Sequence, residues 1–185
     1  MFIINNTHWH LMLNHFPVIG MILGLVLWGM ALSLDIPQLY QTTLVWIMAM
    51  GAITILVYLT GTNSHELIHG LPGVRHEFID THQQWGTYSL SALLLASLTA
   101  LVSLIMMQRA GGSLSRFWKQ CIFLTVLVSV GLTFYTAHLG GLIRHTEIRP
   151  GFTPAQEENI ESSIETQGPD NQTQEAHSHE HSHHH

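Results

Sequence analysis

The sequence predicts an all-α protein, a four-helix up-and-down bundle that crosses a membrane and ends in a disordered, acidic, His-rich tail. Apolar residues make up 46% of the 185 residues and charged residues only 10%, against about 25% charged residues in average soluble domains. Four apolar stretches are each long enough to cross a bilayer core of about 30 Å. We therefore expect a transmembrane domain over residues 1–149 and a tail over residues 150–185.

The same composition excludes several classes of protein. The first 145 residues are almost neutral and carry no basic stripe, which argues against a nucleic-acid partner. Cys121 is the single cysteine and lies inside an apolar stretch, so a disulfide-stabilised scaffold is excluded. No nucleophile dyad and no glycine-rich phosphate loop is recognisable, so acyl and phosphoryl transfer have no support. A lipid bilayer is the expected environment.

The four expected spans contain no Asp, Glu, Lys or Arg. Because hydrocarbon offers no hydrogen bonds, each span must satisfy its own backbone and is predicted to be helical. The first span has no basic segment before it and is too long for a cleaved signal, so we expect it to be retained. The spans cover residues 11–34, 42–60, 85–107 and 120–143.

Two features of the first span predict its local shape. Pro17 lacks the amide that would bond to the carbonyl of Leu13, so the helix should kink there or begin a new segment. A kink at this place would turn the His15 ring toward the bundle. Gly20 and Gly24 form a small-x-x-x-small pair, which allows a neighbouring helix to approach closely.

The basic residues of the short loops predict the orientation. Arg109, Arg116 and Lys119 all lie between the third and fourth spans, and loops enriched in Lys and Arg stay in the cytoplasm. Both termini and the loop between the second and third spans are then expected on the outer side.

Histidine is the unusual residue of this chain, with 15 copies against 12 acidic residues. In a four-span topology every histidine before the tail lies at the same membrane face. His15 and His138 lie about 6 Å and about 8 Å inside their spans, at 1.5 Å per residue. Ionisable residues inside a span mark a functional site by default. The histidines before the tail are His8, His10, His15, His65, His69, His76, His82, His138 and His145.

Imidazoles from several helices just below a membrane surface suit haem b, because two neutral histidines on facing helices can take both axial positions. Gly140 and Gly141, near His138, would leave room for a flat ring. A copper or zinc site without haem is the alternative, since imidazole suits both metals. The alternating histidines of the tail would also bind such metals loosely.

A second alternative is a membrane zinc hydrolase. His65, Glu66 and His69 match the H-E-x-x-H pattern, in which two histidines one helical turn apart hold zinc and the glutamate acts as general base. The longer form of this pattern would place Gly at 72 and His at 75, where Pro72 and Arg75 stand.

Several short motifs resemble those of an uncharacterised bacterial four-helix membrane family, a domain of unknown function sometimes found beside Rieske iron–sulphur modules. The resemblance covers residues 8–149 and implies the four-helix architecture and membrane redox work. His10, His15, His82 and His145 match positions usually occupied by histidine in that family, whereas His65, His69 and His138 are particular to this chain. The motifs are HLMLNHFP from residue 10, YLTG from residue 58, Glu66, LPG from residue 71, IDTH from residue 79 and LGGLIRH from residue 139.

Together these observations predict a bacterial inner-membrane protein with both termini in the periplasm. The leading hypothesis is a cytochrome b-like module that passes electrons at the periplasmic face, exchanging with quinol or a redox partner protein. This favours an electron-transfer or metal-binding protein over a stand-alone enzyme. The preferred axial pair is His15 with His82, and His10 and His145 form a second pair or support the first. His138 completes the candidate cofactor site.

Overall fold

The computed structural model describes residues 6–62 and 76–144, which are helical apart from Asn14 and two short turns. The predicted tail over residues 150–185 lies outside the described residues. In chain order the helices are α1 (Asn6–Leu13), α2 (His15–Leu34), α3 (Pro37–Thr62), α5 (His76–Arg109) and α6 (Arg116–Arg144). The four predicted spans are confirmed as helical, the first divided between α1 and α2, and each helical segment begins before its apolar stretch, by nine residues in α5.

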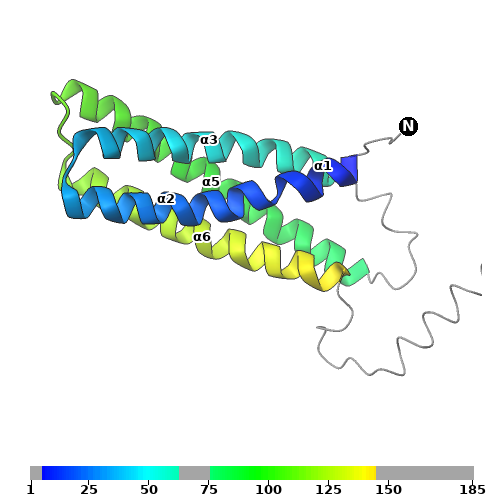
Figure 1. Ribbon diagram of the computed structural model, residues 1–185. Helices are drawn as coiled ribbons and strands as arrows, with labels where there is room; N and C mark the ends of the chain where they lie inside the picture. Colours follow the sequence, from blue (N-terminus) through cyan, green and yellow to red (C-terminus); the bar gives the residue numbers. More distant parts are fainter. Residues whose placement is uncertain (1–5, 63–75, 145–185) are drawn as a thin grey trace, which may run out of the picture.

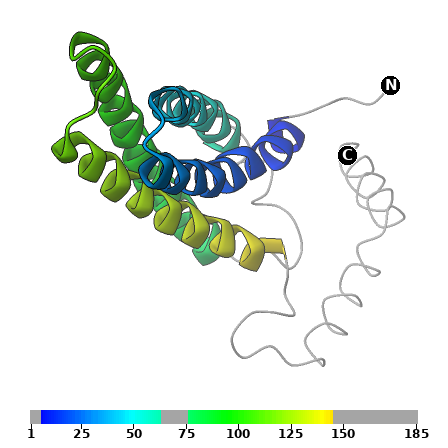
Figure 2. The ribbon, with the colours of Figure 1, turned by 60° about the vertical axis from the view of Figure 1, so that its left-hand side comes forward.

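The helices form an up-and-down bundle in which each long helix packs against two neighbours (Figures 1 and 2). Helix α2 packs against α3 and α6, and α5 packs against the same two helices. Helix α1 continues the line of α2 and packs mainly on α3. All four long segments are long and apolar enough to cross a membrane, which makes this a multi-pass membrane protein by length and composition.

The first span is broken at Asn14, where the sequence predicts a break. Helix α1 ends at Leu13 and α2 begins at His15. Pro17 cannot donate to the Leu13 carbonyl, and its ring crowds that carbonyl. The amide of Asn14 still bonds to the carbonyl of His10 at 3.0 Å, so the chain bends without leaving the membrane-crossing direction.

The two turns at the far end of the bundle use left-handed residues. Asp35, with φ 50° and ψ 38°, ends α2 while its amide donates to the Ala31 carbonyl at 2.9 Å. Gly111 and Gly112 have φ of 68° and 93° after α5, and the Gly112 amide donates to the Met107 carbonyl at 2.9 Å. These left-handed ends let each hairpin reverse within a few residues.

The core lies on the axis of the bundle and is made of aromatic, aliphatic and small residues from all four long helices. Trp28 and Tyr40 stack edge to face, with ring centroids 5.3 Å apart. The outward faces are apolar as well, with Leu95, Leu98 and Phe134 well exposed. Such helices, apolar on all sides, are what a bilayer requires. Further fully buried residues are Met21, Leu44, Ile47, Leu93, Met107, Ile122 and Val126.

Glycines let neighbouring helices approach closely and free carbonyls for hydrogen bonds between helices. Gly20 lies against Met50, and Gly51 lies against Ser97. The indole of Trp46 donates to the Gly20 carbonyl at 2.7 Å. In a medium without a hydrophobic driving force between helices, this close packing and bonding hold the bundle together.

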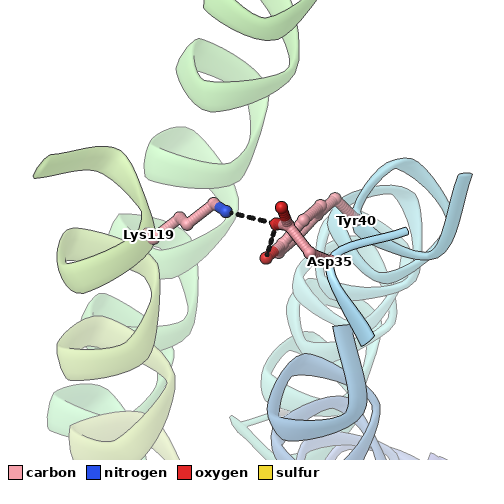
Figure 3. A network of polar contacts seen from close by, with 3 residues as sticks. All are labelled: Asp35, Tyr40 and Lys119. Carbon is pink, nitrogen blue, oxygen red and sulfur yellow. Dashed lines mark hydrogen bonds and ion pairs between the residues drawn. The ribbon is translucent and has the colours of Figure 1, made fainter. Parts of the chain in front are cut away.

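A polar clasp of Asp35, Tyr40 and Lys119 joins the two hairpins at the end opposite the histidines (Figure 3). Lys119 Nζ lies 2.7 Å from Asp35 Oδ1, and the Tyr40 hydroxyl donates to the same oxygen at 3.0 Å. The pKa of Asp35 is held below its ordinary value of 3.8, chiefly by the hydrogen bond from Lys119, then by that from Tyr40 and by the Lys119 charge.

We expect Asp35→Asn to lower the thermal denaturation temperature slightly, because exposed ion pairs contribute little. A depressed carboxyl pKa stabilises the fold above the unfolded value, and this contribution is lost as the pH falls through the folded pKa. The difference from wild type should therefore shrink on acidification below pH 3.8. Circular dichroism in detergent across pH 3–7 measures it, and Lys119→Met should be non-additive with Asp35→Asn. Additive losses would show that the ion pair contributes nothing.

Candidate functional site

Two histidines from different hairpins meet at the end of the bundle where the first and third spans begin. The rings of His10 in α1 and His82 in α5 have centroids 6.4 Å apart and planes at 83°. Both side chains are partly buried. The structure thus brings together two imidazoles that lie 72 positions apart in the sequence.

Each histidine is held by a backbone carbonyl of the next span. His10 Nδ1 lies 2.9 Å from the carbonyl oxygen of Val57 in α3. His82 Nδ1 lies 3.0 Å from the carbonyl oxygen of Thr136 in α6. A carbonyl can only accept, so in both rings Nδ1 carries the proton and donates it. In the neutral ring the free lone pair is then on Nε2, the atom left to bind a metal or another donor.

A glycine makes room for each ring. A Cβ atom at Gly61 would lie 2.7 Å from His10 Cε1, and a Cβ atom at Gly140 would lie 3.0 Å from His82 Cε1. Real Cβ atoms essentially never approach as closely as the first of these distances. Gly61 lies four residues after Val57, and Gly140 lies four residues after Thr136, so each glycine is one helical turn past the carbonyl that accepts from the ring. The Nδ1–Cε1 edge of each imidazole is therefore seated in a notch on the neighbouring helix.

Two side-chain contacts fix the helices around this pair. The hydroxyls of Tyr58 and Thr87 lie 3.2 Å apart and join α3 to α5. The hydroxyls of Ser89 and Thr136 lie 2.8 Å apart and join α5 to α6. Thr136 therefore accepts a hydrogen bond from His82 with its backbone carbonyl and makes a second hydrogen bond, to Ser89, with its side chain.

One helical turn deeper, the bundle contains polar atoms without partners. Asn14 Oδ1 and Thr133 Oγ1 are buried and make no hydrogen bond within the described part of the chain. A Cβ atom at Gly86, one turn after His82, would have its nearest neighbour at 4.0 Å. Buried polar atoms are normally satisfied, so each of these two oxygens is able to accept a hydrogen bond from a bound molecule or water.

The predicted partner of His82, His15, lies on the outside of the bundle. Its side chain is exposed, and Nδ1 donates to the Leu11 carbonyl of its own segment at 3.1 Å. The bend at Asn14 does not turn this ring inward as expected, because five residues are about 140° of helical rotation, and the inward position is taken by His10.

Of the other candidate ligands, only His138 lies within the described residues. His138 is exposed on α6. His145 and the His65, Glu66 and His69 pattern lie outside the described residues. Within residues 6–62 and 76–144, no group of three or more His, Cys, Asp or Glu side chains is arranged to hold a metal ion.

The sequence identifies His10 and His82 as candidates but does not reveal how they are held. The acceptors are backbone carbonyls of Val57 and Thr136, which no side-chain pattern indicates. The only sequence signal is the glycine near the outer end of each partner span, Gly61 and Gly140. Gly140 is expected from the sequence to make room for a flat ring, and in the structure its notch is filled by His82 itself.

No family model, no curated protein and no solved structure matches this chain. Its function is therefore inferred from the geometry of the histidine pair.

We predict that Gly61→Ala destabilises the protein by about 1–3 kcal/mol, the usual cost of overpacking, because the added methyl group would collide with the His10 ring. Gly140→Ala should cost less, since its contact is longer. Gly141→Ala is a matched control, because no atom lies within 4 Å of its added Cβ. Unfolding by SDS titration, followed by tryptophan fluorescence, measures all three. A Gly141→Ala loss as large as that of Gly61→Ala would contradict the notch.

Proposed function

We propose that this multi-pass membrane protein binds one haem b between His10 and His82 and transfers electrons at the membrane face where these residues lie. The observation that carries the proposal is the convergence of two rings from separate hairpins, each held by its Nδ1 with Nε2 left free. The preferred pair is thus His10 with His82, in place of His15 with His82.

The fixed Nδ1 atoms support metal ligation. Histidines that bind metals almost always donate the other ring N–H to a carbonyl or carboxylate, which sets the tautomer and orients the ring. Both rings here have that partner, at 2.9 Å and 3.0 Å. The two ring centroids lie 6.4 Å apart, so a single bound ion would be within reach of both imidazoles.

The number of ligands favours haem over a bare ion. A structural zinc site takes four protein ligands and a catalytic one three, whereas the porphyrin supplies four of the six ligands of haem iron. Two imidazoles therefore complete a haem site but leave a zinc site short, and the described residues contribute no third ligand to this pair. Copper or zinc binding remains the second candidate and is separated from haem by the colour and metal content of the purified protein.

Haem when bound supplies one-electron chemistry. His10 and His82 would hold it, and the carbonyls of Val57 and Thr136 would fix the direction of both imidazoles. Because His10 and His82 would both serve as ligands, the protein would leave little room for a substrate at the metal, which favours electron transfer over catalysis there. Asn14 Oδ1 and Thr133 Oγ1 can accept hydrogen bonds one turn deeper, where a hydroxyl group or water would satisfy them.

The basic loop with Arg109, Arg116 and Lys119 supports a cytoplasmic position for the opposite end of the bundle. In a bacterial inner membrane the histidine pair would then lie at the periplasmic face, and so would both termini. A carrier that reaches this depth from the bilayer, such as quinol, or a redox partner protein at the surface would exchange electrons there.

The absorption spectrum of the full-length protein, purified after expression with ample haem supply, tests the proposal. We expect a Soret band and a sharp reduced α-band. His10→Ala and His82→Ala should each reduce haem occupancy more than about tenfold. Loss of a residue that only hydrogen-bonds to a metal ligand already lowers metal affinity by about tenfold or more. His15→Ala should leave both bands in place because its ring faces outward.

Two results would contradict the proposal. Colourless protein that carries stoichiometric copper or zinc after removal of the His-rich tail would favour the bare-metal site. Loss of the bands in His15→Ala with retention in His10→Ala would restore the pairing of His15 with His82 that the sequence predicts.

A further inference from the structure

The two hairpins of the bundle repeat one another around the histidine pair. His10 donates to the carbonyl of Val57 and fills the notch of Gly61, and His82 does the same with Thr136 and Gly140. In both hairpins the glycine follows the acceptor by four residues. A residue of α1 or α2 corresponds to the residue of α5 whose number is larger by 72. A residue of α3 corresponds to the residue of α6 whose number is larger by 79.

The burial of the first helices follows the same register. The offset of 72 is set by the histidines, and the buried positions further along α2 and α5 keep the same helical phase. Two positions depart: Ala92, the counterpart of Gly20, is only partly buried, and Asp35, the counterpart of the buried Met107, is exposed. The buried counterparts are Pro17 and Ser89, Met21 and Leu93, Gly24 and Ala96, Trp28 and Ala100, and Ala31 and Ser103.

The second helices agree at most positions. Helix α3 begins at Pro37 and α6 begins at Arg116, which correspond under the offset of 79. Thr54 and Thr133 are the same residue type at corresponding buried positions. Three of the seven buried positions of α3 depart: position 123, the counterpart of Leu44, is exposed, and Lys119 and Val130, the counterparts of Tyr40 and Gly51, are only partly buried. Further buried counterparts are Thr43 and Ile122, Ile47 and Val126, and Met50 and Ser129.

Contacts between counterparts locate an axis. In a two-fold arrangement a residue can touch its own counterpart only where the axis passes. His10 touches its counterpart His82 at one end of the bundle. At the other end, Lys119 Nζ lies 4.5 Å from the ring centroid of its counterpart Tyr40, in the clasp drawn in Figure 3. The axis therefore runs the length of the bundle, roughly along the membrane normal.

We infer that the chain is an internal duplication of a two-helix unit and that its cofactor lies on the pseudo-two-fold axis, one per chain, held equally by His10 and His82. Parallel repeats about an axis along the membrane normal are a known architecture of membrane proteins. A site on such an axis is shared by both units, so it binds one ion rather than two. The inference rests on the proposed role of His10 and His82 as ligands. It does not require haem, because it holds for any metal that both imidazoles bind.

The experiment measures cofactor stoichiometry and the equivalence of the two ligands on the full chain. Haem per chain is determined by the pyridine haemochrome assay and should be one, with a redox titration that follows a single one-electron curve. His10→Met and His82→Met each leave one imidazole and one thioether, and they should give the same spectral change. Using methionine keeps a ligand at each position, so the result does not depend on the cavity left by alanine.

A copper arm makes the two proposals separately falsifiable. Cu²⁺ is added to the purified wild type and to the double variant His10→Ala/His82→Ala, which retains all copper bound by the His-rich tail. The wild type should bind one copper ion per chain more than the double variant. The single variants His10→Ala and His82→Ala should each lose this ion, and their remaining copper affinities should agree within about threefold. Circular dichroism confirms that the variants are folded.

Three outcomes distinguish the two proposals. One copper shared equally, but no haem, overturns the proposed function and supports the shared site. Two haems per chain, or a His10 variant that loses its cofactor while the His82 variant keeps it, overturns the shared site and leaves haem binding intact. Failure to bind either haem or copper at these histidines overturns both.

Discussion

The absence of water inside a bilayer is the constraint on which the arrangement of this protein depends. A polar side chain on a spanning helix finds no solvent, so its hydrogen bonds are made with the protein itself or with a bound molecule. Most hydroxyls bond within their own helix, as Thr43 does with Leu39 and Thr54 with Met50. His10, His82 and Trp46 instead bond to carbonyls of a neighbouring helix. These three bonds set how the helices lie against one another, and two of them also aim the imidazoles.

The same constraint explains which parts of the fold the sequence predicts. Spans must be long, apolar and free of charge, so the four stretches are recognisable from length and composition alone. The break at Asn14 is recognisable too, because Pro17 removes one particular hydrogen bond. The additional helical turns at the ends of the spans cannot be recognised in this way, because they carry polar residues that are also typical of loops.

The candidate site is harder to predict, for a geometric reason. Histidines at 10 and 15 both begin the same span, and only the rotational phase of the helix decides which one faces the bundle. A helix that is apolar on every side gives no sign of that phase. The acceptors at Val57 and Thr136 are backbone atoms, which no side-chain pattern in the sequence indicates.

Because each glycine notch is filled by a histidine ring, the residues at the two positions are expected to vary together in evolution. A larger residue at 61 is tolerable only if the ring at 10 becomes smaller, and the same holds for 140 and 82. Among descendants and relatives of this chain, histidine and glycine should therefore be gained and lost together within each hairpin. Coupled substitution of that kind would record the packing of these helices in an alignment, without any knowledge of what the imidazoles bind.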